Sequence, residues 1–382
     1  MSAAKLREAL VAGLRRDGYL HDPAVERAFL RVPRECFLPG IELADVYRDA
    51  AILIKEEGGV GVSSSSQPAI MAIMLEMLDV QPGQRVLEIG AGSGYNAAIL
   101  REMVGAGGKV ATVEIDAEVA AWARERLDAA GYPDVAVRQA DGADGWPDGE
   151  PWDRVIATVG AGDIAPAWVE QLRDGGILVL PLGLGPAQAV AAFERRGERL
   201  VSRAVEPAGF IRMRGRMADS WRPAEIASGI SAMTDQPLEA LDRLSMLLRT
   251  TPSAEPWPGS LRDGLYIVSI LAGIPVVALW STNTEVSFFG PAFGRIDPEG
   301  RGLALVVETN GAAQLLVFGD DSAASLLRAD YDCWSRAGGP SIRDLRFAAW
   351  PRGRAPQPGL GRLAFDLPSW TLIVDWPAAQ AR

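Results

Sequence analysis

The residues best suited to bind a cofactor lie between Glu88 and Glu114. Glu88 is followed by three glycines in the segment Gly90-Ala91-Gly92-Ser93-Gly94, and then by Tyr95 and Asn96. Glycine lets the backbone turn tightly and come close to a ligand that a Cβ atom would obstruct. A glycine-rich turn between a buried strand and a helix N-terminus therefore predicts a pocket for a nucleotide-containing cofactor. Glu114 follows Gly94 by 20 residues, where a carboxylate can accept hydrogen bonds from both ribose hydroxyls.

The spacing of this motif favours S-adenosylmethionine over a nicotinamide dinucleotide. Dinucleotide folds use Gly-x-Gly-x-x-Gly, whereas here the third glycine comes one residue early and Tyr95 stands in its place. The carboxylate of Glu88 would repel a pyrophosphate but attract a cofactor that carries sulfonium and ammonium groups. A nicotinamide dehydrogenase is further disfavoured because the sequence offers no plausible proton-transfer histidine. The remaining alternative is an ordinary strand-turn-helix connection that binds no ligand.

The composition narrows the class of protein. The chain has 382 residues and a net charge of −11, so it can form two domains but lacks the basic surface that nucleic-acid binding requires. With two cysteines and one histidine, neither a metal site nor a disulfide framework is predicted. Residues 1–16 form a charged amphipathic pattern, not a signal peptide. The longest apolar run, 267–280, contains a proline and is too short to cross a bilayer. We therefore expect a cytoplasmic protein without nucleic-acid or membrane partners.

Helix and strand patterns alternate around these motifs. From residue 85 the sequence predicts strands at 85–89, 109–114, 134–138, 153–159 and 176–181, with helices between them at 95–104, 117–130 and 164–172. Such alternation predicts an α/β fold with a parallel sheet. Residues 188–206 are expected to add paired antiparallel strands. Upstream, residues 1–62 should form a cap of short helices and loops, and Pro68 should begin a helix capped by the preceding serines.

Several ordered motifs between residues 6 and 215 resemble the protein-L-isoaspartate O-methyltransferase family. They are Val-Pro-Arg-Glu-Cys-Phe-Leu-Pro (32–39), Ser-Ser-Ser-Gln-Pro (64–68), the glycine motif, Gln-Ala-Asp-Gly (139–142) with Gly-Trp-Pro (145–147), Pro-Trp-Asp-Arg (151–154), and Glu-Gln-Leu before a Gly-Gly pair (170–176). The resemblance implies the class I S-adenosylmethionine-dependent methyltransferase fold, which is Rossmann-like with a mostly parallel seven-stranded sheet. Residues 1–218 would then be the catalytic domain, with the cap at 1–62 and the core at 63–218.

The same resemblance implies a set of cofactor contacts. Glu88 and the glycine turn would hold the methionyl part, Glu114 the ribose, and Asp141 with Gly142 the adenine amino group. An alternative for Asp141 is a turn former at a strand end. The full predicted set for S-adenosylmethionine, and for its product S-adenosylhomocysteine, is Glu88, Gly90, Ala91, Gly92, Ser93, Gly94, Tyr95, Asn96, Glu114, Ile115, Asp141 and Gly142.

Ser66 occupies the position of the family's substrate-site serine, and we assign it the catalytic role. It could instead serve only as the helix cap before Gln67 and Pro68, although a cap also leaves backbone N–H groups aimed at an anion. The predicted substrate-binding residues are Ser63, Ser64, Ser65, Ser66, Gln67, Arg212 and Arg214. A carboxylate acceptor is already ionised at neutral pH, with an ordinary pKa near ~4, so orientation and not a strong base should supply most of the rate gain. A neighbouring backbone nitrogen can then displace the methyl ester and close a succinimide.

Two departures from the family concern the substrate. Where the family has Phe-Val-Pro-Leu, the chain reads Phe-Ile-Arg-Met at 210–213, followed by Arg214 and Arg216. These arginines could contact a substrate or could form a solvated strand face. Residues 219–382 hold seven of the eleven tryptophans. They predict an appended α+β domain for substrate recognition, homodimerisation or both, with strand-like runs at 265–280, 284–289, 303–309, 313–319 and 371–375 and a helix near 322–336.

An appended domain on this core is similar to methyltransferases that act on ribosomally made peptides such as lanthipeptides, lasso peptides and ATP-grasp-linked peptides. The leading sequence-based hypothesis is therefore methylation of an aspartate in a constrained peptide, leading to an aspartimide. The alternative is methylation of L-isoaspartyl or D-aspartyl residues during protein repair. A non-catalytic S-adenosylmethionine-binding scaffold is a third possibility.

Overall fold

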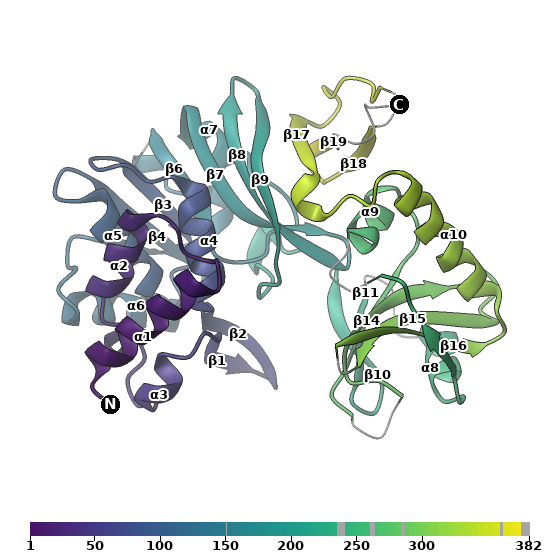
Figure 1. Cartoon of the computed structure of the whole chain (residues 1–382). Coiled ribbons are helices and arrows are strands. Elements are labelled where there is room, and N and C mark those ends of the chain that lie inside the picture. The colour runs from purple at the N-terminus through teal and green to yellow at the C-terminus, as the bar shows by residue number, and fades with distance from the viewer. Residues whose placement is uncertain are drawn as a thin grey trace.

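The computed structural model of the chain describes residues 1–149, 151–234, 241–259, 264–283, 287–309, 311–359 and 362–375. These residues form two lobes, each built on its own sheet (Figure 1). Within these ranges no helix combines the length and the apolar character needed to cross a bilayer. Nor do the same ranges bring three His, Cys, Asp or Glu side chains together as a metal site.

A ten-stranded sheet forms the first lobe. Its order is β18-β19-β17-β9-β8-β7-β6-β3-β4-β5. The neighbouring strands β7, β6, β3, β4 and β5 are parallel. Strand β8 pairs antiparallel with β7, and β9 pairs antiparallel with β8. These seven strands confirm the predicted class I methyltransferase core. They are β3 (Arg85–Ile89), β4 (Lys109–Glu114), β5 (Ala136–Gln139), β6 (Trp152–Ala157), β7 (Leu172–Leu184), β8 (Ala187–Arg196) and β9 (Arg199–Pro207).

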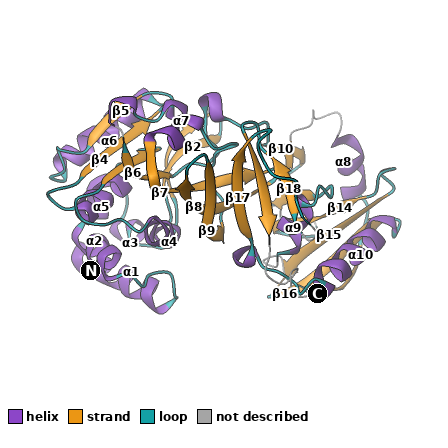
Figure 2. Ribbon diagram, turned by 90° about the horizontal axis from the view of Figure 1, so that it is seen from above, coloured by secondary structure: helices purple, strands orange, loops and turns teal. Residues whose placement is uncertain are grey.

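Helices cover both sides of this sheet (Figure 2). A parallel strand between two layers of helices is buried on both faces, and in β3 every residue after Arg85 is buried, Glu88 included. Helix α5 packs on β3 and β4, and α6 packs on β4 and β5. The helices of this core are α4 (Pro68–Leu78), α5 (Tyr95–Val104), α6 (Ala117–Ala129) and α7 (Pro166–Gln171).

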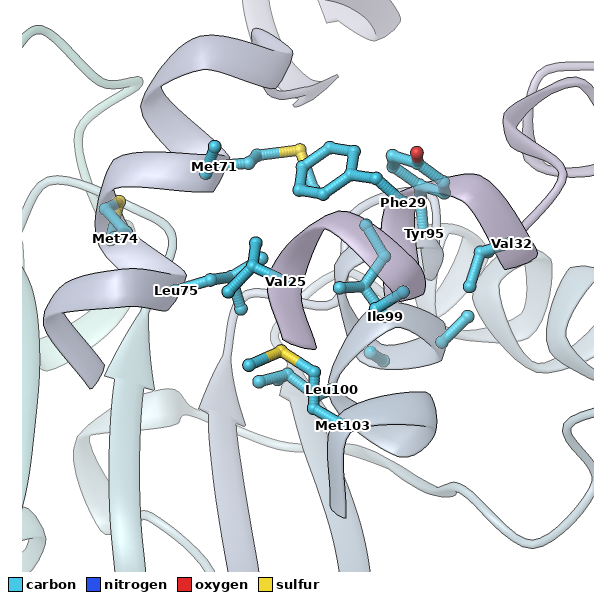
Figure 3. Close-up of a cluster of buried hydrophobic side chains, with 14 of the residues drawn as sticks. Val25, Phe29, Val32, Met71, Met74, Leu75, Tyr95, Ile99, Leu100 and Met103 are labelled. Atoms are coloured by element: carbon cyan, nitrogen blue, oxygen red, sulfur yellow. The ribbon is translucent and has the colours of Figure 1, made fainter. Parts of the chain in front are cut away.

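The N-terminal cap packs directly on the helix that follows the glycine turn. It contains α1 (Ala3–Arg16), α2 (Pro23–Arg31) and α3 (Leu43–Val46). Phe29 of α2, Leu75 of α4 and Tyr95 of α5 are at most 2% exposed and belong to one apolar cluster (Figure 3). The cap is therefore part of the core that positions the start of α5.

Residues 52–65 form a hairpin where the sequence predicts loops as far as Val62. Strand β1 (Ile52–Glu57) pairs with β2 (Val60–Ser65), and Gly58 and Gly59 turn between them with φ of +57° and +81°. Two glycines with positive φ are typical of a tight hairpin turn. The charged residues of β1 and the serines of β2 hid the alternating apolar pattern on which a strand prediction depends.

An antiparallel sheet of order β10-β11-β13-β14-β15-β16-β12 forms the second lobe. Helix α10 packs on β14, β15 and β16, and α9 contacts β7 of the first sheet. The strands are β10 (Arg222–Ala227), β11 (Ile230–Thr234), β12 (Ser253–Pro256), β13 (Val277–Ser281), β14 (Gly290–Ile296), β15 (Gly302–Thr309) and β16 (Ala312–Gly319). The helices are α8 (Asp242–Leu248), α9 (Leu265–Leu271) and α10 (Ser322–Arg336).

The structure confirms the predicted helix at 322–336 but corrects the strand predicted at 265–280. That run contains α9 and β13, because Gly273 at φ +71° and Pro275 end the helix before the strand begins. Of the predicted strand at 284–289, residues 284–286 lie outside the described residues.

The chain returns to the first sheet after α10. Strand β17 (Arg346–Pro351) pairs with β9, and β19 (Trp370–Asp375) and β18 (Leu363–Asp366) continue the sheet beyond it. The sequence assigns all of 219–382 to an appended domain, but these last strands belong to the first sheet. The edge of β9 would otherwise expose unpaired backbone groups, which β17 covers.

Candidate active site

A cavity of about 220 Å³ lies at the carboxyl ends of β3 and β4. Three segments far apart in sequence line it: the glycine turn, the junction of β2 with α4, and residues 209–214. All the predicted substrate-binding residues line this cavity, as do the predicted cofactor-binding residues except Gly94 and Asp141. The fold thus brings together the residues that the sequence separates by up to 151 positions, from Ser63 to Arg214.

The glycine turn requires glycine at each of its three positions, because all three have a positive φ, and Gly92 and Gly94 also lie against other segments of the chain. Gly90, Gly92 and Gly94 have φ of +96°, +51° and +86°, which side chains rarely adopt. A Cβ on Gly92 would lie 3.2 Å from the carbonyl oxygen of Ser64, so β2 passes directly over the turn. A Cβ on Gly94 would lie 3.2 Å from the carbonyl oxygen of Ala123 in α6. Gly94 therefore serves close helix packing and does not line the cavity, and its contact with the cofactor stays a prediction.

Glu88 supplies a buried carboxyl group at one end of the turn. Its side chain is fully buried and accepts hydrogen bonds from Asn96 Nδ2 at 2.8 Å and from Thr112 Oγ1 at 2.6 Å. Burial raises the pKa of Glu88 from 4.5 to about 7, although both hydrogen bonds act against this shift. A carboxyl group beside a cavity and short of cationic partners suits a ligand that brings positive charge.

Glu114 supplies a second carboxylate at the end of β4. It is 8% exposed and accepts hydrogen bonds from the backbone N–H groups of Gly92 and Asp116, both at 3.2 Å. The contact with Gly92 places this carboxylate against the glycine turn, where the sequence predicts the ribose hydroxyls. The two carboxyl groups and the open backbone of the turn fit S-adenosylmethionine, which carries cationic groups and a ribose but no phosphate.

Asp141, which precedes the cavity residue Gly142, accepts hydrogen bonds from two backbone N–H groups. One carboxylate oxygen accepts the N–H of Ala143 at 2.9 Å, and the other accepts the N–H of Arg216 at 3.0 Å. The neighbouring Gly142 lines the cavity, but Asp141 does not. One oxygen thus holds the local turn, as in the turn-former alternative, and the other holds the distant residue Arg216; the contact with adenine stays a prediction.

The structure separates the two roles considered for Ser66. Helix α4 begins at Pro68 and receives no side-chain cap from Gln67 or the serines. Asp49 caps the helix instead. One of its carboxylate oxygens accepts a hydrogen bond from the N–H of Ala69, and the other accepts one from Gln67 Nε2, each at 2.8 Å. Within the described part of the chain the Ser66 hydroxyl makes no hydrogen bond, so it is available to a ligand in the cavity that it lines.

Residues 209–214 form a further part of the cavity wall. The N–H of Met213 donates to the carbonyl of Gly160 at 2.8 Å, and the N–H of Gly160 donates to the carbonyl of Ile211 at 2.9 Å. Arg212 forms an ion pair with Asp219 and donates to the carbonyl of Gly185 at 3.1 Å. This wall is therefore tied to the segment that leads into the second lobe.

A group of opposite charges, which we call the hairpin latch, joins β1 to the start of α6. Lys55 Nζ lies 2.7 Å from Asp116 and 2.8 Å from Glu118, and Arg214 lies 3.2 Å from Asp116. Glu57 completes the latch at 3.3 Å from Lys55. The hydrogen bond from Lys55 lowers the pKa of Asp116 to about 2. Acidic residues pair with both Arg212 and Arg214, so the alternative of a solvated arginine face does not describe these two residues, and their contact with substrate stays a prediction.

Sequence reasoning missed Asp49, Lys55 and Arg34 as residues of this site. Arg34 lies within the quoted Val-Pro-Arg motif, and its 0% exposure could have been suspected from the apolar residues around it. Asp49 gave no local signal, because the helix that it caps begins 19 residues later.

Comparisons with known proteins agree with this geometry. The family model for protein-L-isoaspartate(D-aspartate) O-methyltransferase matches residues 4–218. The protein-L-isoaspartate O-methyltransferase of Hyperthermus butylicus is 39% identical over 228 residues, which cover 57% of this chain and 92% of that relative. That of Methanosarcina mazei is 43% identical over 179 residues, covering 47% of this chain and 71% of the relative. A solved structure of a protein-L-isoaspartate O-methyltransferase has a TM-score of 0.55 and 26% identity, covering 90% of this chain and 96% of the other.

Proposed function

The chain belongs to the protein-L-isoaspartate(D-aspartate) O-methyltransferase family, and on that premise we propose that it methylates the free α-carboxylate of L-isoaspartyl residues in proteins or peptides. Its enzyme class is that of the S-adenosylmethionine-dependent protein carboxyl O-methyltransferases. An isoaspartyl linkage runs through the side-chain carboxyl group, so the α-carboxylate remains free to accept a methyl group.

The observation that carries this choice of substrate is the extent of the structural match. The family model ends at residue 218, but the solved protein-L-isoaspartate O-methyltransferase aligns over 90% of this chain. Such an alignment must extend into the second lobe. The extra lobe, on which the constrained-peptide hypothesis depends, therefore does not distinguish this chain from an isoaspartate methyltransferase.

The chain's own residues account for the other requirements of the reaction. S-adenosylmethionine supplies a methyl group on a positively charged sulfur, which a carboxylate oxygen can attack. The acceptor is ionised near neutral pH because an ordinary carboxyl pKa is about 4, so the chain needs no strong base. The Ser66 hydroxyl can donate a hydrogen bond to the acceptor carboxylate and orient it. The apolar residues Met71, Val159 and Phe210 line the same cavity and exclude water around the reacting groups.

An aspartate in a constrained ribosomal peptide is the second candidate acceptor. The observation that favours it concerns Arg212. This residue lines the cavity and is paired with Asp219, which lies just before β10, the first strand of the second lobe. A binding site shaped by that lobe could require a folded peptide. Homodimerisation through the second lobe and a cytoplasmic location stay predictions.

A matched peptide pair tests the proposal. Two synthetic peptides of one sequence, one with L-isoaspartate and one with L-aspartate at the same position, are incubated with S-adenosylmethionine, and base-labile methyl ester is measured with the +14 mass change. We expect ester on the isoaspartyl peptide only. Ester on neither peptide, together with measurable S-adenosylhomocysteine binding, would favour the constrained-peptide acceptor or the non-catalytic scaffold. Ester on the aspartyl peptide would contradict the proposed specificity.

A further inference from the structure

A fully buried arginine stands behind the acceptor side of the cavity. Arg34 is 0% exposed and lies at the start of the short helical turn Arg34–Phe37 in the N-terminal cap. Its guanidinium donates to three carbonyl oxygens, those of Arg48 at 3.3 Å, Ala50 at 3.3 Å and Ser66 at 3.0 Å. One side chain thus joins the loop around Asp49 to the residue assigned as catalytic.

The same guanidinium also contacts the cofactor side of the cavity. Its Cζ atom lies 5.7 Å from the centre of the Tyr95 ring, and Tyr95 is the first residue of α5 after the glycine turn. A guanidinium over an aromatic ring is a favourable arrangement for a buried cation. Arg34 therefore spans the gap between the strand that presents Ser66 and the helix that begins at the cofactor turn.

The charge of Arg34 has only weak compensation. Among the described residues no carboxylate forms an ion pair with it; the charge of Asp49, whose oxygens accept from Ala69 and Gln67, acts on the guanidinium only from beyond ion-pair distance. Burying an arginine among neutral carbonyls costs free energy unless the surroundings supply negative charge. An anionic acceptor bound in the cavity beside Ser66 would bring that charge.

We propose that Arg34 is a positioning residue for the acceptor: it holds the Ser66 peptide so that the hydroxyl faces the cavity, and its buried positive charge favours binding of an acceptor carboxylate. Asp49 completes the arrangement by fixing Gln67 and the first turn of α4. The proposal rests on the proposed function for the identity of the acceptor, but the positioning of Ser66 rests on the contacts alone.

The chain offers a matched control at the other end of α4. Arg154 is 5% exposed, and its guanidinium donates to the carbonyls of Leu78 at 2.7 Å and Asp79 at 2.8 Å. It is also a buried arginine that holds backbone carbonyls, but its partners Leu78 and Asp79 do not line the cavity, whereas Ser66 does. Substituting Arg154 should therefore disturb folding to a similar degree without affecting the acceptor.

The test compares Arg34→Lys, Arg34→Met and Arg154→Met in the full chain, with the isoaspartyl peptide as substrate. For Arg34→Met we expect kcat/KM for the peptide to fall about 100-fold, mainly through a higher peptide KM, while the S-adenosylhomocysteine Kd stays within about 2-fold. Arg34→Lys keeps the charge and should recover about 10-fold of this loss. Arg154→Met should change kcat/KM by no more than about 3-fold.

Hydrogen exchange supplies a readout that needs no turnover. Arg34→Met should speed exchange of the amides in residues 63–69 but not in residues 86–98. Equal losses in Arg34→Met and Arg154→Met, a parallel loss of S-adenosylhomocysteine affinity, or unchanged exchange at 63–69 would overturn the proposal. If Arg34→Met does not fold, the lysine variant and Asp49→Asn carry the same comparison. An inactive wild-type enzyme would refute the proposed function, while the exchange measurement would still decide the role of Arg34.

Discussion

Replacing the buried Glu88 by glutamine should stabilise the cofactor-free protein at pH 8 but not at pH 5. Glu88 is fully buried and its pKa is raised from 4.5 to about 7 by desolvation. The folded protein therefore binds this proton more tightly than the unfolded chain does. The stability that the protonated group contributes is fully present below pH 4.5 and is lost as the pH rises through about 7. At ~1.4 kcal/mol per pKa unit, the loss amounts to ~3 kcal/mol.

Glu88→Gln removes this pH-dependent loss because an amide does not ionise. The glutamine can still accept from Asn96 and donate to the Thr112 hydroxyl, so both local contacts survive. The free energy of unfolding of variant and wild type is measured by urea denaturation from pH 5 to pH 8. Glu8→Gln, an exposed carboxylate on α1, serves as the control. Between pH 5 and pH 8 the free energy of unfolding of the variant, relative to that of the wild type, should rise by about 2–3 kcal/mol. That of the control should not change relative to the wild type.

Cofactor binding should reverse the preference of Glu88 for its protonated form. A bound cation favours ionised Glu88, so the affinity of the wild type for S-adenosylmethionine should rise with pH up to about 7, and Glu88→Gln should lose this dependence. A stability difference between variant and wild type that is the same at pH 5 and pH 8 would refute the reasoning about Glu88. So would an affinity for S-adenosylmethionine that does not change with pH in the wild type.

Three further predictions follow from the geometry of the cavity. Ser66→Ala should lower kcat/KM for the isoaspartyl peptide about 10-fold or more, yet leave the free energy of unfolding within ~0.5 kcal/mol, because Asp49 and not Ser66 caps α4. Asp49→Ala is the contrasting variant and should cost ~1 kcal/mol in urea denaturation; a similar loss for Ser66→Ala would mean that the serine is a structural residue. Gly92→Ala should weaken S-adenosylhomocysteine binding about 10-fold by calorimetry, because its Cβ would crowd the Ser64 carbonyl at 3.2 Å and its φ is positive; unchanged affinity would show that β2 can move away freely. Lys55→Met should speed S-adenosylhomocysteine release about 3-fold in stopped-flow measurements by weakening the hairpin latch, and raising the salt concentration should do the same to the wild type; equal rates would exclude the latch as a restraint on the cofactor.

The sequence predicted the parallel core well because its signals are local. The strand at 85–89 and the helix at 95–104 agree with β3 and α5 at both ends, since a short, mostly apolar run that ends in a glycine turn leaves little freedom. The hairpin at 52–65 could not be found in this way. Its serines and charged residues pair with partners across the hairpin and on α6, which only the folded chain brings near.

Among the predicted site residues, most of those in the backbone turn line the cavity, whereas the contacts of other residues depend on partners that are distant in the sequence. Asp141 follows a strand and precedes a glycine, which is compatible with a cofactor contact and with a turn, and its contact with Arg216, 75 residues away, could not be read from the local sequence. The cap of α4 could not be predicted from the local sequence either. The serines are the nearest candidates in the sequence, but Asp49 provides the cap. The last strands joined the first sheet because of an open edge at β9, which leaves no mark in the sequence near residue 346.

Competition between the two peptides in a single reaction tests the central claim most directly. Equal amounts of the isoaspartyl peptide and its aspartyl twin, distinguished by an isotope label outside the acceptor residue, share the enzyme and S-adenosylmethionine. The ratio of the two methyl esters at early times gives the ratio of kcat/KM. We expect nearly all ester to form on the isoaspartyl peptide. Equal labelling, or preferential labelling of the aspartyl peptide, would contradict it.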